Sequence, residues 1–173
     1  MPNKVVAVDF NDNELKVYDK MQAHIKPVLH RAFSVFLYNG SKVLLQKRAL
    51  EKYHSGGLIA NTCCSHPQAN ENIVENAKQR LIEELNIKVD FLEEIGTFTY
   101  YNKFNDNLYE YEYDHVLVGN FNGSYEANPE EVMWLDWVEV EEIKKDIVEN
   151  PDKYAVWFIT AFTMFLKFFN NKK

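Results

Sequence analysis

One helical pattern, from Asn72 to Leu85, stands in the middle of a chain whose other patterns are mostly those of short strands. Ala77, Leu81 and Leu85 recur every four residues, which is the spacing of one buried helix face. Asn72 followed by Glu75 is typical of a helix N-cap. Many strands with helices inserted between them predict an α+β sandwich.

Two hairpins are predicted ahead of this helix. VVAVDF (5–10) and ELKVYD (14–19) flank a polar turn, which indicates an opening hairpin. RAFSVFLY (31–38) and KVLLQKRA (42–49) flank Asn39-Gly40, a strong signal for a tight hairpin turn. Strand patterns continue at LIANTCC before the helix, and return after it in IGTFTYYN, LYEYEYDHVLVG and MWLDWVEV.

Helical patterns close the chain. The first is VEEIKKDIVE, and Asn150-Pro151 then predicts the cap and first residue of another helix. The most apolar segment, from Tyr154 to Phe169, is short for a bilayer span and is interrupted by Lys167. We therefore expect a buried helix that closes the core.

Length and charge narrow the class of protein. A chain of 173 residues, 46% of them hydrophobic, fits one domain covering residues 1–173. The formal net charge of −7 disfavours nucleic acid or an anionic membrane as the main partner, so we expect neither. The amino end lacks the pattern of a signal peptide, which predicts a cytoplasmic protein with free thiols. We expect a monomer or a weak dimer.

The only two cysteines are adjacent, in NTCCSHPQ. Neighbouring cysteines rarely bond to each other, and no CxxC-like pair is present for a structural zinc site. If the segment is a strand, Cys64 and His66 share one face while Cys63 points to the other. Cys63 is then a packing residue, whereas Cys64 is either a packing residue or a reactive group.

The same alternation applies to LYEYEYDH. Glu110 and Glu112 face one side of a strand, and the alternating Tyr109, Tyr111 and Tyr113 face the other. One interpretation is a solvated strand face with the tyrosines packed inward. The alternative is a divalent cation site or a proton-transfer site, because two adjacent carboxylates need a metal or a proton between them.

Histidines and cations supply further candidates. His24 and His30 flank Pro27, and their spacing fits a loop that runs into a strand. His54 and His115 are interpreted as ordinary histidines. Four cations are candidate anion contacts, although each taken singly is more often a solvated charge: Lys20, Arg48, Lys52 and Arg80.

The end of the predicted helix is unusually acidic. Arg80 and Glu84 are spaced as an ion pair on one flank. Glu83 and Glu84 oppose the helix dipole, so a nearby positive charge is expected, and a bound magnesium ion would supply it.

The run from Ser65 to Ile87, SHPQANENIVENAKQRLIEELNI, resembles a degenerate Nudix box. Acidic positions of that box are kept at Glu71, Glu83 and Glu84. Gln79-Arg80 replaces its arginine–glutamate pair, Ser65 its opening glycine and Asn86 its closing glycine. These departures weigh against a Nudix pyrophosphatase.

NTCCSHP, with HxxxxxH and KRAL upstream and ExE downstream, resembles the type I isopentenyl-diphosphate isomerases. The resemblance runs from about Lys20 to the region of Trp157. It implies a Nudix-like α/β/α sandwich with a mixed sheet and an additional N-terminal β-hairpin. It also implies interconversion of isopentenyl and dimethylallyl diphosphate, a small-molecule diphosphate substrate, through a tertiary carbocation.

The resemblance also assigns roles to residues. Cys64 and Glu112 match the catalytic pair, with Tyr100 as a pocket residue that assists the glutamate. Trp157 matches the aromatic wall of the isoprenoid pocket, and Lys20, Arg48, Lys52 and Arg80 match contacts of the diphosphate. A buried divalent ion (Mn²⁺, Zn²⁺ or Mg²⁺) would be held by His24, His30, His66, Glu110 and Glu112, and a second ion, Mg²⁺, by Glu84 and the backbone carbonyl of Cys64.

Two other functions remain open. A Nudix-type hydrolase of a nucleoside diphosphate derivative would release phosphate or a nucleotide. A non-catalytic metal-binding or interaction module would retain metal without turnover. Its Cys64→Ala variant would be indistinguishable from the parent protein.

Overall fold

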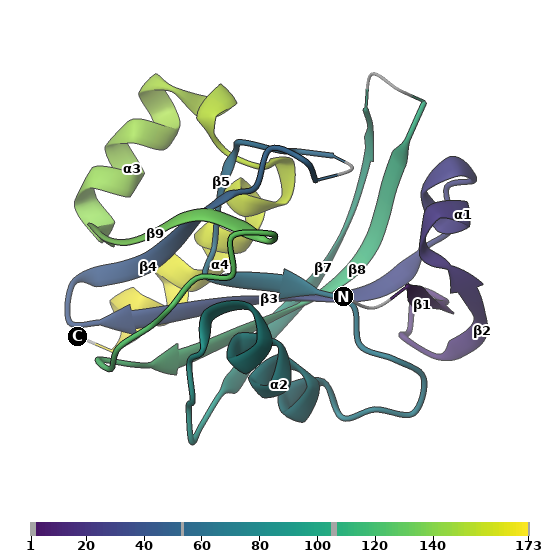
Figure 1. Cartoon of the computed structure of the whole chain (residues 1–173), viewed down its shortest axis with the longest axis horizontal. Coiled ribbons are helices and arrows are strands. Elements are labelled where there is room, and N and C mark those ends of the chain that lie inside the picture. The colour runs from purple at the N-terminus through teal and green to yellow at the C-terminus, as the bar shows by residue number, and fades with distance from the viewer. Residues whose placement is uncertain (1–2, 53, 105–106, 173) are drawn as a thin grey trace.

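The computed structural model describes residues 3–52, 54–104 and 107–172, which form a mixed β-sheet with helices on both faces (Figure 1). The strands are β1 (Lys4–Val8), β2 (Glu14–Asp19), β3 (His30–Asn39), β4 (Lys42–Arg48), β5 (Ile59–Ala60), β6 (Cys63–Ser65), β7 (Glu93–Lys103), β8 (Tyr109–Asn120) and β9 (Val132–Glu139). The helices are α1 (Lys20–Ile25), α2 (Ile73–Leu85), α3 (Val140–Glu149) and α4 (Val156–Asn171), with a 3-10 turn, η1 (Pro151–Lys153), ahead of α4. The predicted α+β class and N-terminal hairpin are confirmed, since β1 pairs antiparallel with β2.

Strand β3 sets the register of the sheet. One edge of β3 runs parallel to β8 over residues 30–38. Its other edge is shared in turn by β1, opposite His30, by β6, opposite residues 33–35, and by β4, opposite Tyr38 and Asn39. The predicted hairpin at Asn39-Gly40 is confirmed, and Gly40 takes the left-handed backbone that such a turn needs (φ 58°). Segments far apart in the chain, β6 and β8, are therefore aligned on one strand.

Two apolar cores cover the two faces of the sheet. On the α2 face, Leu81 and Leu85 of the helix pack against side chains of β3 that include Val35. On the α4 face, Phe158 and Phe165 stack on Phe36 of the same strand. Figure 1 shows α2 and α4 on opposite sides of the sheet. No helix in the described part of the chain is both long and apolar enough to cross a bilayer, and α4 instead buries its aromatic side against the sheet.

The last helix begins later than predicted. Pro151 opens the 3-10 turn, and α4 starts only at Val156. Between them the backbone is extended, because the Ala155 N–H donates to the carbonyl of Ile59 (2.9 Å) and so joins β5. Asn150 therefore does not cap α4, and the prediction for this boundary was wrong.

Two helix ends matter for the site. The cap of α2 is confirmed, since Asn72 Oδ1 accepts from the Glu75 N–H (3.0 Å), and Asn86 takes the left-handed conformation at the other end (φ 52°). The prediction that His24 lies in a loop was wrong, because it lies on α1. That short helix is capped by Asp19, whose Oδ1 accepts from the Met21 N–H, and it ends before Pro27. A helix of this length is too short for a periodic pattern to reveal.

Candidate active site

The face on which each candidate residue lies follows from the β3 register. Cys64 is paired with Ser34, and Glu112 is paired with His30. Ser34 and His30 are four residues apart on one strand and so share a face. Cys64 and Glu112 therefore project from β6 and β8 to the same side, which is the α4 face. Cys63 points into the α2 core and is fully buried there, as predicted.

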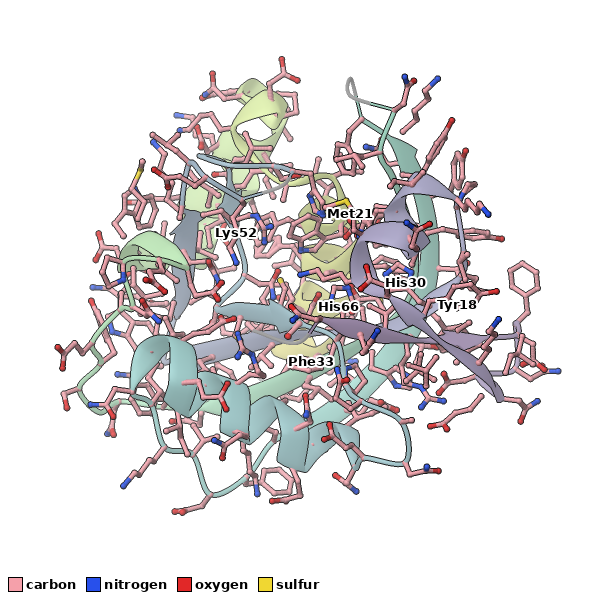
Figure 2. All side chains as sticks on the ribbon, turned by 45° about the vertical axis from the view of Figure 1, so that its right-hand side comes forward. Tyr18, Met21, His30, Phe33, Lys52 and His66 are labelled. Carbon is pink, nitrogen blue, oxygen red and sulfur yellow. The ribbon has the colours of Figure 1, made fainter. Side chains whose placement is uncertain are left out.

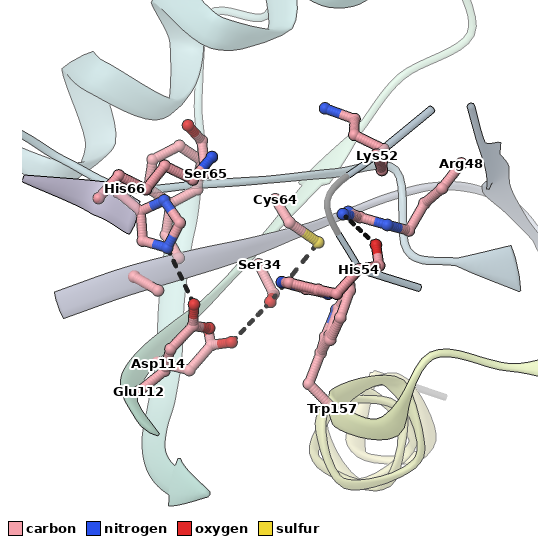
Figure 3. A pocket seen from close by; sticks show the side chains of 13 residues that line it. Ser34, Arg48, Lys52, His54, Cys64, Ser65, His66, Glu112, Asp114 and Trp157 are labelled. Atoms are coloured by element: carbon pink, nitrogen blue, oxygen red, sulfur yellow. Dashed lines mark hydrogen bonds and ion pairs between the residues drawn. The ribbon is translucent and has the colours of Figure 1, made fainter. Parts of the chain in front are cut away.

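A small cavity of about 30 Å³ opens on the α4 face between β3, β6, β8 and α4 (Figure 3). Its volume admits about one water molecule. The thiol of Cys64, the carboxylate of Glu112 and the indole of Trp157 all border it. The complete lining is Lys20, Ala32, Phe33, Ser34, Arg48, Lys52, His54, Cys64, Ser65, His66, Glu112, Asp114 and Trp157.

The Cys64 thiol is held in place by Asn61. Sγ lies 3.2 Å from Asn61 Oδ1, and the same oxygen accepts from the Trp157 Nε1–H at 3.2 Å. The Asn61 amide is itself fixed, because Nδ2 donates to the carbonyls of Val35 (3.1 Å) and Cys63 (2.9 Å). Burial raises the pKa of the Cys64 thiol to about 12, which makes it a neutral, proton-bearing group at neutral pH.

The two glutamates of β8 are buried, and the tyrosines between them lie on the half-buried opposite face. The interpretation with inward-packed tyrosines was therefore wrong. Tyr100 of β7 joins the two carboxylates, since its Oη lies 2.6 Å from Glu110 Oε1 and 2.9 Å from Glu112 Oε1. Burial, with the charge of Glu110 next in importance, raises the pKa of Tyr100 well above its ordinary value, so its hydroxyl remains a donor.

Imidazoles face the other oxygen of each carboxylate. Glu112 Oε2 is 2.9 Å from Nε2 of His66 and 3.4 Å from Nε2 of His30. Glu110 Oε2 is 3.2 Å from Nε2 of His24 and 2.5 Å from Nε2 of His54. Figure 2 shows His30 and His66 in the interior, beside α1.

The donor set of this cluster fits a divalent cation. Ligand atoms of His24, His30 and Glu112 all lie within 4.8 Å of one another. Burial lowers the pKa of His66 to about 4, so that imidazole is neutral and able to bind a metal. Buried Nε2 of His30 is not aligned for a hydrogen bond, although a carboxylate oxygen faces it. Uncharged imidazoles and paired carboxylates are the ligands of a divalent metal site.

Three of the four predicted anion contacts border the cavity: Lys20, Arg48 and Lys52. The Arg48 guanidinium lies 5.1 Å from the centre of the Trp157 ring, and Lys52 forms an ion pair with Glu131. Burial, reinforced by the charge of Lys52, lowers the pKa of Lys20 to about 8.

Arg80 and Glu84 lie on α2 and do not line the cavity. Arg80 Nη2 is 2.5 Å from Glu84 Oε1 and 3.8 Å from Glu131 Oε1, and it also pairs with Glu83 through Nη1. The positive charge expected at this helix end is thus supplied by Arg80. Through Glu131 the pair is connected to Lys52 at the cavity wall.

Sequence reasoning missed three residues of the site. His54 was interpreted as ordinary, yet it borders the cavity and contacts Glu110, a residue distant from it in the chain. Asn61 opens the NTCCSHP motif, but the sequence analysis gave it no role. Asp114 could have been found from strand parity with Glu112, whereas nothing local marks His54. His115, also interpreted as ordinary, lies outside the cluster on the other face of β8, where it pairs with Asp12 and Glu94.

Comparison with known proteins defines the class. Residues 28–158 match the NUDIX domain family. The fold is similar to that of the MutT protein from Methanosarcina mazei (TM-score 0.66, 16% identity, covering 84% of this chain and 96% of that one). It is also similar to a MutT NUDIX hydrolase from Burkholderia pseudomallei (TM-score 0.64, 14% identity, 79% and 97%). At these identities the similarity concerns the fold alone.

Curated relatives define the group more closely. The chain is 42% identical over 158 residues to isopentenyl-diphosphate Delta-isomerase 2 of Aromatoleum aromaticum, covering 91% of this chain and 83% of the relative. It is 40% identical over 170 residues to isopentenyl-diphosphate Delta-isomerase of Aliivibrio fischeri, covering 94% of each. The chain therefore belongs to the Nudix superfamily and, within it, to the isopentenyl-diphosphate Delta-isomerase family.

Proposed function

We propose that the protein interconverts isopentenyl diphosphate and dimethylallyl diphosphate, a step of isoprenoid biosynthesis. The observation that carries this function is the placement of Cys64 and Glu112, from separate strands, on the wall of one buried cavity. Relatives that span most of the chain bear the name of this activity.

The reaction adds a proton at C4 of the substrate and removes one from C2, so the double bond moves from C3–C4 to C2–C3. The intermediate is a tertiary cation at C3, which water would capture. The site must therefore be dry and must offer one proton donor and one acceptor. The cavity has room for about one water molecule, so its lining must move to admit the alkyl chain and would exclude water by closing around it.

Cys64 and Glu112 are the groups that would exchange protons with the substrate. One donates while the other accepts, and the roles reverse with the direction of reaction. The Cys64 thiol is protonated at neutral pH. Tyr100 would orient the Glu112 carboxylate through the hydrogen bond to Oε1.

Trp157 would stabilise the cation. Its ring borders the cavity, and the Nε1–H bond to Asn61 fixes its orientation. An indole face attracts a desolvated cation by on the order of 2 kcal/mol.

The five residues predicted as ligands, His24, His30, His66, Glu110 and Glu112, would hold a divalent ion, Mn²⁺, Zn²⁺ or Mg²⁺. When bound, such an ion neutralises the two buried carboxylates and so influences the protonation of Glu112. The neutral imidazole of His66 and the Tyr100 hydroxyl complete the surroundings of the Glu112 carboxylate.

Lys20, Arg48 and Lys52 would bind the substrate diphosphate from the cavity rim and orient the alkene. Arg80 would contribute from α2. Glu84 and the Cys64 carbonyl would hold a second ion, Mg²⁺, that bridges to the diphosphate. In the structure Glu84 is paired with Arg80, so binding this ion requires the pair to loosen.

The test is incubation of the purified protein with isopentenyl diphosphate and Mg²⁺, followed by separation of the products. Dimethylallyl diphosphate is the expected product. Release of phosphate alone would favour a Nudix hydrolase instead. That alternative is weaker, because Gln79-Arg80 replaces the arginine–glutamate pair of the Nudix box, and relatives that span most of the chain bear the name of the isomerase.

A further inference from the structure

His54 is the one histidine of the buried cluster that lies outside the ligand set implied by the family resemblance. It sits in the loop between β4 and β5. The loop is closed at its base, since the Gly57 N–H donates to the carbonyl of Arg48 and the Arg48 N–H donates to the carbonyl of Leu58, both at 2.9 Å. Its side chain is buried and borders the same cavity as Cys64.

The His54 ring is held in the way expected of a metal-binding imidazole. Nδ1 lies 3.0 Å from Ser55 Oγ, and the ring stacks on Phe104 with centroids 4.6 Å apart and 9° between planes. His24 and His30 show the same arrangement, with Nδ1 at 2.6 Å from the Lys20 carbonyl and 2.8 Å from that of Val28. A carbonyl at Nδ1 can only accept, so it selects the tautomer of His24 and His30 whose Nε2 carries the electron pair, whereas the Ser55 hydroxyl can either accept from Nδ1 of His54 in the same way or donate to it.

His54 also completes a symmetrical pattern around the two carboxylates. Each carboxylate has one oxygen on Tyr100, and its other oxygen faces two imidazole Nε2 atoms. Glu112 faces His30 and His66, whereas Glu110 faces His24 and His54. If Nδ1 of His54 donates to Ser55, an electron pair on Nε2 points at a carboxylate 2.5 Å away. That arrangement is repulsive unless a cation lies between them.

We propose that His54 is a further protein ligand of the divalent ion bound by this cluster, reaching it through Nε2 from the side of Glu110. Ligand atoms of His24, His54 and Glu110 lie within 4.8 Å of one another. The site would then offer four imidazoles, which favours Zn²⁺ or Co²⁺ over Mg²⁺. The inference rests on the proposed function only in requiring that the cluster bind an ion.

The experiment measures the affinity of the purified full chain for Zn²⁺ by competition with a chromophoric chelator, together with the absorption spectrum of the Co²⁺ form. His54→Ala should lower Zn²⁺ affinity at least about tenfold, since even outer contacts of a metal site are worth that much. It should also change the Co²⁺ spectrum. His115→Gln, on the opposite face of β8, is the matched control and should change neither.

His54→Gln separates a ligand from a hydrogen-bond donor. A glutamine keeps an N–H for Glu110 but binds metal poorly, so it should lose affinity as alanine does. Full affinity in His54→Gln would overturn the proposal, as would wild-type affinity in His54→Ala. If the alanine variant fails to fold, as judged by circular dichroism, the glutamine variant decides.

The activity assay separates this inference from the proposed function. A wild-type protein that binds no Zn²⁺ overturns the His54 proposal and the metal site together. A wild-type protein that binds Zn²⁺ but forms no dimethylallyl diphosphate overturns only the function.

Discussion

On the α2 face of the sheet, Cys63 packs among leucines; on the α4 face, one residue later, Cys64 meets Asn61, Trp157 and a cavity. The same contrast recurs on β7, where Tyr100 bonds two buried carboxylates while its neighbour Tyr101 is 55% exposed. Alternation along a strand thus assigns adjacent residues of the same type to different tasks. In each pair, a substitution of the residue outside the site is therefore the control for the same substitution of its neighbour in the site.

The cysteine pair should give the largest effect. Cys64→Ala removes a proton-transfer group and should lower kcat on isopentenyl diphosphate by on the order of 10²–10⁴-fold. Cys63→Ala removes a buried packing group whose thiol also donates to Glu84 Oε2 (3.3 Å), and the variant should retain most of the activity per folded molecule. Steady-state kinetics on both variants test the comparison, and equal losses would contradict the division between the faces.

Substitutions in the core on the α2 face should lower the free energy of unfolding rather than the turnover number. Leu81 is fully buried in that core, so Leu81→Ala should lower the free energy of unfolding by about 2–5 kcal/mol while leaving kcat of the folded protein near wild type. Its neighbour Ile82 is 36% exposed, and Ile82→Ala should cost much less. Urea denaturation measures both. A loss of kcat in folded Leu81→Ala equal to that of Cys64→Ala would show that the two faces are not separable.

The tyrosine pair should give an intermediate effect. Tyr100→Phe removes a hydrogen bond to ionised carboxylates, a contact worth about 1.5–3 kcal/mol, so kcat should fall about 10- to 100-fold with a smaller change in KM. Tyr101→Phe should behave as wild type. A Tyr100→Phe variant that changes KM alone would move this residue from the proton-transfer step to substrate binding.

The smallest effect concerns pH. The pKa of Lys20 is lowered to about 8, so its charge is complete well below pH 8 and is lost as the pH rises through that value. Binding of the diphosphate should weaken accordingly, and kcat/KM should fall several-fold at higher pH, since Lys20 is only one of three cations that border the cavity. Lys20→Arg should abolish this fall of kcat/KM at higher pH. An unchanged profile in that variant would assign the fall to another group.

Local patterns predicted much of the fold. The helix at Asn72–Leu85, the hairpin at Asn39-Gly40 and the faces of Cys64 and Glu112 depend on spacing within a few residues, and all three were predicted correctly. The start of α4 was misplaced, because a hydrogen bond from Ala155 to a distant strand interrupts the helix. Helix α1 was missed because it is only six residues long.

The sequence by itself determined which side chains share a strand face, since the alternation of a β-strand is a property of the local backbone. Only the tertiary structure decided which strands became neighbours, with β3 placed between β6 and β8 so that the Cys64 thiol and the Glu112 carboxylate border a single cavity. It also decided that His54 joins the cluster. The partners of His54, Glu110 and Phe104, lie about fifty residues away in the chain, and no local pattern encodes a contact that depends on how a loop folds over a sheet.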